Sequence, residues 1–149
     1  MTEVAFYHLS ASPLEKALPK LLEKTLAAGK RALVMAGSEE RVESLNAALW
    51  TYDQGSWLPH GAGRDGRPPE QPVWLTCHDE NPNGAVFLFL TDGARSARVA
   101  EYERCFELFD GGDPAAVEAA RERWKAYQAD GHALAYWQQS ETGGWQRQK

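Results

Sequence analysis

Short apolar runs alternate with helical periodicity in the first fifty residues. Residues 4–9 (VAFYHL) and 31–36 (RALVMA) have the length of strands, and the second run is apolar through its middle, as in a strand covered on both faces. Leucine or valine then recurs every three or four residues, within 14–26 and again within 39–50. This order of strand, helix, strand and helix predicts a parallel sheet with right-handed crossovers.

The start of the first helix carries a recognisable signal. Ser12, Pro13 and Glu15 have the spacing of an N-cap, a first-turn proline and a capping-box acid, and Gly29 is expected to end the helix. Pro19 lies inside this segment, so the helix either kinks there or begins its regular part there.

The second half of the chain continues the same pattern. Residues 72–77 (PVWLTC) and 85–90 (AVFLFL) read as strands on either side of the turn sequence NPNG, and residues 104–109 read as another. Asp113 and Pro114 then provide a cap and a first helical residue for a long helix that extends to Asp130. We predict an α/β fold: one domain with a mostly parallel central sheet flanked by helices.

The last helix has two different apolar stripes. At about 100° per residue, one quadrant of the helix contains a valine, a tryptophan, two cations and an amide. These residues are Val117, Arg121, Trp124, Lys125 and Gln128. The adjacent stripe of Ala116, Ala120 and Tyr127 suits packing against a sheet. The first stripe is typical of a surface that binds a ligand with apolar and anionic groups. In the alternative interpretation, Trp124 packs under the sheet beside Tyr127, and Arg121 and Lys125 are only solvated.

Composition narrows the possible functions. The 149 residues, 43% hydrophobic and 25% charged, suit a single soluble domain with a genuine core. With 16 Lys and Arg against 21 Asp and Glu, the net charge of −5 argues against strong nucleic-acid binding or membrane-surface binding. Two cysteines form no disulfide framework, and neither a signal peptide nor a membrane span is evident, so we expect a reduced, cytoplasmic protein.

One glycine motif suggests a nucleotide site. Residues 61–66 (GAGRDG) match the G-x-G-x-x-G pattern, in which the glycines must join a strand to a helix that holds a pyrophosphate. Arg67-Pro68-Pro69 follows, and this sequence cannot open a normal helix. We therefore expect no nucleotide site and no cofactor, and keep a small nucleotide-binding α/β enzyme that uses the loop from Gly61 to Gly66 as the alternative function.

The sequence gives little indication of a metal site or of catalytic residues. Cys77 and His78 are adjacent, so on a strand their side chains would point to opposite faces and would not readily share an ion. No nucleophile motif is evident, and the spacing suggests no histidine partner for either cysteine beyond His78 next to Cys77. We predict no metal site and no catalytic residues.

Six tryptophans are many for a chain of this length. Trp50 ends a predicted helix, and Trp57 precedes Leu58-Pro59 in a turn. Tryptophan is enriched at interaction hot spots and is seldom completely buried, so core packing and partner contact are both open for this pair.

Several segments, taken in order, resemble the chi subunit of bacterial DNA polymerase III holoenzyme. They are Leu49-Trp50, Ser56-Trp57-Leu58-Pro59-His60-Gly61, Pro72-Val73-Trp74-Leu75, Ala120-Arg121-Glu122-Arg123-Trp124-Lys125-Ala126-Tyr127 and Gly131-His132. No single motif is decisive, but their joint order and spacing are specific. The resemblance extends from the first strand to about Trp137, which gives a chi-like domain over residues 1–137 and a C-terminal tail over 138–149.

This resemblance implies a Rossmann-like fold without a nucleotide site, and a non-catalytic accessory subunit of the clamp-loader assembly. Such subunits bind the acidic C-terminal tail of single-stranded DNA-binding protein, and connect it to the loader through the psi subunit. The residues that would bind the tail are Val117, Arg121, Trp124 and Lys125, with Gln128 at the edge. The residues that would bind psi or an equivalent partner are Trp50, Trp57, Leu58 and Pro59. A purely structural assembly subunit is a third possibility.

Overall fold

The computed structural model describes residues 2–51, 61–62 and 71–148, the last two residues of the first range by their backbone only. The strands in these ranges are β1 (Glu3–Leu9), β2 (Ala32–Met35), β3 (Gly61–Ala62), β4 (Val73–Thr76), β5 (Phe87–Leu90), β6 (Arg104–Asp110), β7 (Ala133–Gln139) and β8 (Trp145–Arg147). The helices are α1 (Leu14–Ala27), α2 (Glu39–Thr51), the short 3-10 helix η3 (Val99–Glu101) and α3 (Pro114–Ala129). The predicted α/β class is confirmed, and each predicted strand and helix is found within two residues of its expected limits.

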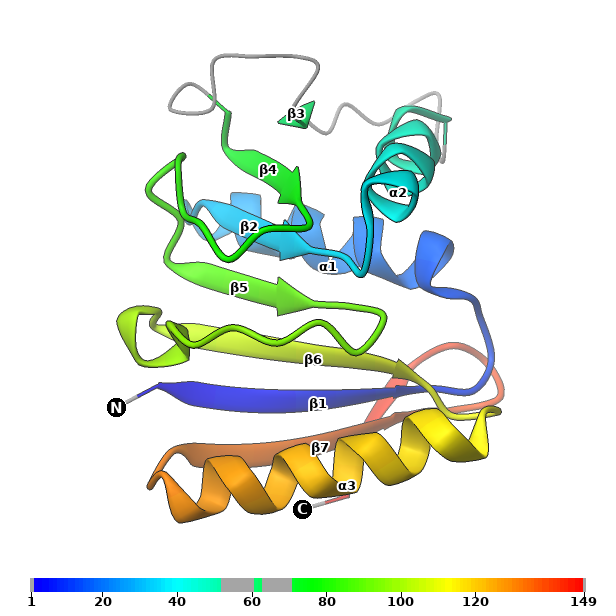
Figure 1. Ribbon diagram of the computed structural model, residues 1–149. Helices are drawn as coiled ribbons and strands as arrows, with labels where there is room; N and C mark the ends of the chain where they lie inside the picture. The colour runs from blue at the N-terminus through cyan, green and yellow to red at the C-terminus, as the bar shows by residue number, and fades with distance from the viewer. Residues whose placement is uncertain (1, 52–60, 63–70, 149) are drawn as a thin grey trace.

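The described strands form one sheet in the order β3-β4-β2-β5-β6-β1-β7-β8 (Figure 1). Every neighbouring pair is parallel except β7 and β8. Every residue of β2, β4 and β5 is buried. For β2 this agrees with the prediction of a strand covered on both faces. No helix in the described ranges is long and apolar enough to cross a membrane.

Alternation along β1 separates two cores. Ala5 and Tyr7 belong to the core beneath α1 and α2, and Val4 and Phe6 to the core on the opposite face, with α3. In Figure 1, α3 lies in front of the sheet along β7, and α1 lies behind the sheet. The helix α3 contacts both β6 and β7. Layers of helix, sheet and helix follow from this alternation.

The sheet has a topological switch point between β1 and β6. From β1 the chain passes through α1 to β2, towards one edge of the sheet, whereas from β6 it passes through α3 to β7, towards the other edge. The loops that leave β1 and β6 therefore separate at the carboxyl ends of two neighbouring strands. Ligands of open α/β sheets bind in crevices of this kind.

A side-chain amide occupies the loop after β1. The Gln139 Oε1 oxygen accepts hydrogen bonds from the backbone N–H groups of Ser10, Ala11 and Ser12 at 3.2, 2.9 and 3.0 Å. Its Nε2 group donates to the Ser12 hydroxyl at 2.8 Å. The prediction that Ser12 caps α1 is therefore wrong by one residue: Pro13 is the N-cap and provides no side-chain hydrogen bond. The helix then continues through Pro19.

The segment after α3 was not predicted to form strands. β7 runs from Ala133 to Gln139 beside β1, and β8 pairs antiparallel with it. The expected limit of the chi-like domain at Trp137 therefore falls inside β7, and the expected tail over 138–149 contains β8. Tyr7 contacts the Trp145 ring, with centroids 4.8 Å apart, so this segment also contributes to the core.

Replacing Gln139 with alanine is expected to lower the free energy of unfolding by about 1–3 kcal/mol, because three N–H groups lose one buried acceptor. Urea unfolding followed by circular dichroism measures this change. Gln138→Ala is the matched control: its neighbouring side chain is exposed, and the expected effect is within about 0.5 kcal/mol. Equal losses in the two variants would contradict the role assigned to Gln139.

Candidate partner-binding pocket

The long predicted helix forms as expected. The Asp113 side chain caps α3 by accepting a hydrogen bond from the Ala115 backbone at 3.0 Å, and Pro114 occupies the first helical position. After the helix, Gly131 adopts a φ of 83°, and its N–H group donates to the Gln128 carbonyl. These signals fix both ends of α3, and therefore fix which of its residues lie in each turn.

A buried ion pair joins α3 to the sheet. Arg123 Nε donates to Glu107 Oε1 at 3.0 Å, and the Tyr127 hydroxyl donates to Glu107 Oε2 at 2.6 Å. The Glu107 side chain is 1% exposed and that of Arg123 is 7% exposed. Burial raises the pKa of Glu107, and the Arg123 guanidinium opposes this shift. Together with buried Ala120, these contacts direct one face of α3 inward.

This orientation places the predicted binding stripe at the boundary between the core and the solvent. The Trp124 side chain is half-buried and meets the Phe6 ring edge-on, with centroids 5.3 Å apart. It also meets the Tyr136 ring at 6.1 Å. Arg121 and Lys125, one turn apart on the outer side, have side chains that are 71% and 72% exposed. The indole is therefore not sealed inside, and both cations face the solvent.

A pocket of about 520 Å³ opens beside this stripe, and we call it the α3 pocket. Its lining residues are Phe6, Phe109, Val117, Glu118, Ala120, Arg121, Trp124, Lys125, Tyr136, Gln138 and Gln148. The volume lies within the range of roughly 300–1,000 Å³ that is usual for ligand pockets. Four of the five predicted residues line it together, whereas Gln128 is exposed and is not part of the lining.

Two acids already accompany the cations. Glu118 lies 3.6 Å from Arg121, and Glu122 lies 3.6 Å from Lys125, each three residues away along α3. Exposed pairs of this kind are worth only about 0–1 kcal/mol each, so a bound carboxylate can replace them at low cost.

The floor of the α3 pocket is held by a second polar contact. The Tyr136 hydroxyl lies 2.7 Å from Nδ1 of His8. Partial burial lowers the pKa of His8, which favours the neutral form of the ring that shares this hydrogen bond. Gly111 makes room for the ring, because any side chain there would collide with it. Gln138 on β7 and Gln148 also line the pocket. The backbone N–H group of Gln148 donates to the Tyr136 carbonyl at 2.7 Å.

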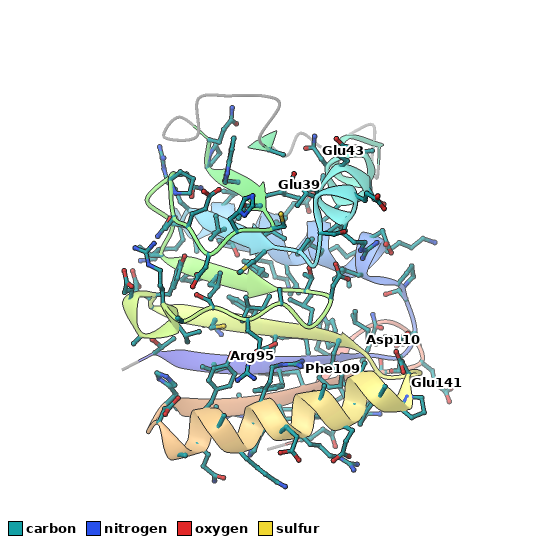
Figure 2. All side chains as sticks on the ribbon, viewed as in Figure 1. Glu39, Glu43, Arg95, Phe109, Asp110 and Glu141 are labelled. Atoms are coloured by element: carbon teal, nitrogen blue, oxygen red, sulfur yellow. The ribbon has the colours of Figure 1, made fainter. Side chains whose placement is uncertain are left out.

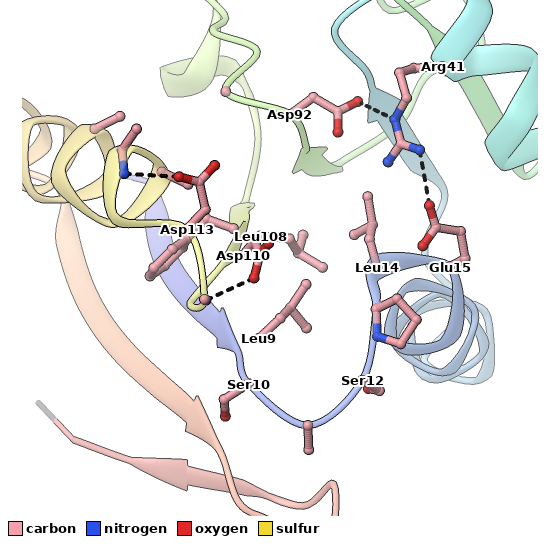
Figure 3. A pocket seen from close by; sticks show the side chains of 18 of the residues that line it. Leu9, Ser10, Ser12, Leu14, Glu15, Arg41, Asp92, Leu108, Asp110 and Asp113 are labelled. Atoms are coloured by element: carbon pink, nitrogen blue, oxygen red, sulfur yellow. Dashed lines mark hydrogen bonds and ion pairs between the residues drawn. The ribbon is translucent and has the colours of Figure 1, made fainter.

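A larger cavity of about 830 Å³ lies at the switch point (Figure 3). The carboxylates that line it are Glu15, Asp92, Asp110 and Asp113, and the cations are Arg41 and Arg123. Arg41 is bound to Asp92 and to Glu15 at 3.0 Å each, as Figure 3 shows, and Arg123 is bound to Glu107. An excess of carboxylates repels phosphates and acidic peptides. Size therefore favours this cavity, but charge favours the α3 pocket for an anionic ligand.

The expectation that the Cys77 and His78 side chains diverge is wrong. β4 ends at Thr76, so both residues follow the strand in a bend, where alternation no longer applies. Their sulfur and Nε2 atoms lie 3.7 Å apart. Both also lie close to Oε1 of Glu39, at 3.0 and 3.1 Å. The hydrogen bond between Cys77 and Glu39 raises the pKa of the thiol and lowers the pKa of the carboxyl.

Two other predicted sites fall largely outside the described residues. Trp57, Leu58, Pro59 and the side chain of Trp50 lie outside them. Of the glycine motif, only Gly61 and Ala62 are described, and they form the edge strand β3 beside β4.

A described sheet of parallel strands with one antiparallel edge pair, helices on both faces and a switch point between β1 and β6 defines a doubly wound, Rossmann-like α/β protein. The sequence profile of the family described as DNA polymerase III chi subunit, HolC, matches residues 1–135. A probable DNA polymerase III subunit chi from Rickettsia prowazekii (strain Madrid E) is 33% identical over 110 residues, which cover 72% of this chain and 67% of the relative. The chain belongs to the DNA polymerase III chi subunit family, an accessory subunit of the replication machinery.

The two arginines of α3 are expected to differ sharply in their effect on stability. Arg123→Ala leaves the Glu107 carboxylate buried without its counter-ion, so the free energy of unfolding should fall by about 3–5 kcal/mol. Arg121→Ala, two residues away and exposed, is the matched control, with a change within about 0.5 kcal/mol. Chemical denaturation measures both, and a small loss in Arg123→Ala would show that the buried pair does not hold α3.

Proposed function

We propose that the protein is a non-catalytic subunit that holds the acidic C-terminal tail of single-stranded DNA-binding protein in the α3 pocket. We further propose that it bridges that protein to the clamp loader through psi or an equivalent component. Its membership of the chi family supports this role. The observation that carries the first part is the arrangement in the α3 pocket: two exposed cations one turn apart, beside a half-buried indole over an aromatic floor.

The chemistry of such a tail matches the pocket in two ways. Its hydrophobic end fits the space between Val117 and Trp124, and burying an aromatic side chain there contributes about 1.5–3 kcal/mol. Its carboxylates, including the terminal one, reach Arg121 and Lys125, where each exposed pair adds about 0–1 kcal/mol. The apolar insertion therefore provides much of the affinity. The cations orient the tail and speed its encounter with the pocket.

Modest affinity for one tail suits the proposed role. A DNA-bound oligomer of single-stranded DNA-binding protein presents several tails, and multivalent attachment strengthens the contact without any new interface. The tail can also exchange quickly, since Arg121 and Lys125 have Glu118 and Glu122 as partners in its absence.

The proposed contact with psi or an equivalent loader component is supported by the family and by the sequence around Trp50 and Trp57. A tryptophan pair beside the Leu58-Pro59 sequence has the composition of a hydrophobic hot spot. Because α2 packs on β3 and β4, far along the sheet from β7 and α3, the end of α2 gives this second partner a separate approach.

Trp124→Ala is expected to weaken the binding of an acidic peptide with a C-terminal phenylalanine by at least about tenfold, or about 1.4 kcal/mol. Arg121→Ala is expected to weaken it by up to about fivefold, because one exposed pair contributes at most about 1 kcal/mol. Fluorescence anisotropy of the labelled peptide measures the dissociation constant, and thermal unfolding verifies that each variant is folded. Lys20→Ala on α1 removes an exposed cation from the opposite side of the sheet and should leave binding unchanged. Unchanged affinity in both α3 variants would disprove the proposed site.

The two proposed contacts are expected to be separable by mutation. In pull-down experiments, Trp57→Ala should lose psi or the equivalent loader component and keep single-stranded DNA-binding protein. Arg121→Ala should keep psi or the equivalent component and retain less single-stranded DNA-binding protein, because it alters only the α3 pocket. Loss of both partners in Trp57→Ala, with the fold intact, would contradict two independent contacts. Retention of both partners in Trp57→Ala would remove that surface from the proposal.

A further inference from the structure

Glu39, Cys77 and His78 form the only group of three metal-ligating side chains found together in the described part of the chain. Each offers one ligand atom, and the three atoms lie within 4.8 Å of one another. The group is remote from the α3 pocket: Glu39 begins α2 (Figure 2), and Cys77 and His78 follow β4, with four strands between β4 and β7.

We propose that Glu39, Cys77 and His78 form a binding site for a divalent cation of the zinc class. A sulfur, an imidazole nitrogen and a carboxylate oxygen are the three donor types that Zn²⁺ accepts, whereas Ca²⁺ and Mg²⁺ require oxygen donors. Three protein ligands leave a fourth position for water. The Glu39 and His78 side chains are 72% and 68% exposed, so an ion can enter directly from solvent.

The separations between the donor atoms suit one central ion. Zinc–ligand bonds of about 2.0–2.3 Å in a tetrahedral arrangement place neighbouring donors roughly 3.3–3.6 Å apart. Here the sulfur lies 3.0 Å from the carboxylate oxygen and 3.7 Å from the imidazole nitrogen, and that nitrogen lies 3.1 Å from the oxygen. Shifts of a few tenths of an ångström bring all three to coordination distance. The thiol proton is released to solvent when the thiolate binds the ion.

The backbone that carries these ligands is held by its own hydrogen bonds. The N–H group of His78 donates to Thr76 Oγ1 at 3.0 Å, and that hydroxyl donates to Glu80 Oε1 at 2.9 Å. The next residue, Asp79, accepts hydrogen bonds from Ser96 Oγ and from the Ala97 backbone, which join this bend to a neighbouring loop. On the other side, Val42 and Leu45 are buried and fix the first turns of α2. The ligands are therefore positioned before any ion arrives.

The site is tested with the full-length chain, free of any affinity tag, stripped of metal with a chelator and kept reduced with a phosphine. Titration with Zn²⁺ in a calorimeter should give one ion per chain. Cys77→Ala and His78→Ala should each weaken binding by at least about tenfold, and Glu39→Gln should also weaken it. Glu40→Gln, the adjacent exposed carboxylate on α2, is the matched control and should bind as the unmodified chain does.

Co²⁺ provides a second measurement that identifies the ligand. The thiolate-to-cobalt absorption band should appear in the unmodified chain and in Glu40→Gln, and should be absent in Cys77→Ala. Glu39, Glu40 and His78 are exposed and Cys77 is half-buried, and thermal unfolding without metal verifies that all four variants fold. Zinc affinity that is the same in Cys77→Ala and His78→Ala as in the unmodified chain would overturn the proposal, as would the absence of stoichiometric binding. A cobalt band that persists in Cys77→Ala would also overturn it.

Discussion

The buried pair between Glu107 and Arg123 determines how α3 lies on the sheet. Glu107 is held in the middle of β6, with both carboxylate oxygens bonded to α3, one to Arg123 and one to Tyr127. Rotating the helix would leave a charge buried without its partner, at a cost of several kcal/mol. Because this inner contact fixes the rotation, Trp124 reaches the edge of the core, and Arg121 and Lys125 project into solvent. The geometry of the α3 pocket follows from a contact outside the pocket.

Gln139 determines what the loop after β1 can bind, at the switch point where Rossmann-like folds bind their ligands. In nucleotide-binding members of this architecture, backbone N–H groups of the first loop face a phosphate. Here the Gln139 side chain accepts hydrogen bonds from the N–H groups of Ser10, Ala11 and Ser12, and carboxylates gather in the cavity beside that loop. The fold therefore keeps the crevice that is typical of its class, but carboxylates line this crevice and would repel a phosphate. The cations of the α3 pocket lie elsewhere, on the exposed side of α3.

Local signals were sufficient for much of this structure. The strands β1, β2 and β4–β6 and the three α-helices follow from hydrophobic periodicity and from caps such as Asp113. The stripe with Trp124 follows from helical geometry alone. Contacts between distant residues were not predictable in this way. From the sequence, Arg123 has the pattern of an exposed charge on a helix, and its partner Glu107 lies sixteen residues earlier in the chain. A glutamate inside an apolar strand does indicate that a buried partner is required. Gln138 and Gln139 are polar residues at the end of β7, and the sequence alone assigned them to a C-terminal tail. The close approach of the Cys77 and His78 side chains depends on the position at which β4 ends.

The two sides of α3 are under different constraints. Glu107, Arg123 and Tyr127 form one closed set of bonds, so an acceptable change in any of them requires compensation from the others. Arg121 and Lys125 have only weak neighbours in the same helix, so they can be exchanged singly. Over evolutionary time the outward stripe is therefore free to follow changes in a partner's sequence one residue at a time, while the inward triad keeps the scaffold constant. The sequences of related proteins are therefore expected to differ more on the outward side of α3 than on its inward side.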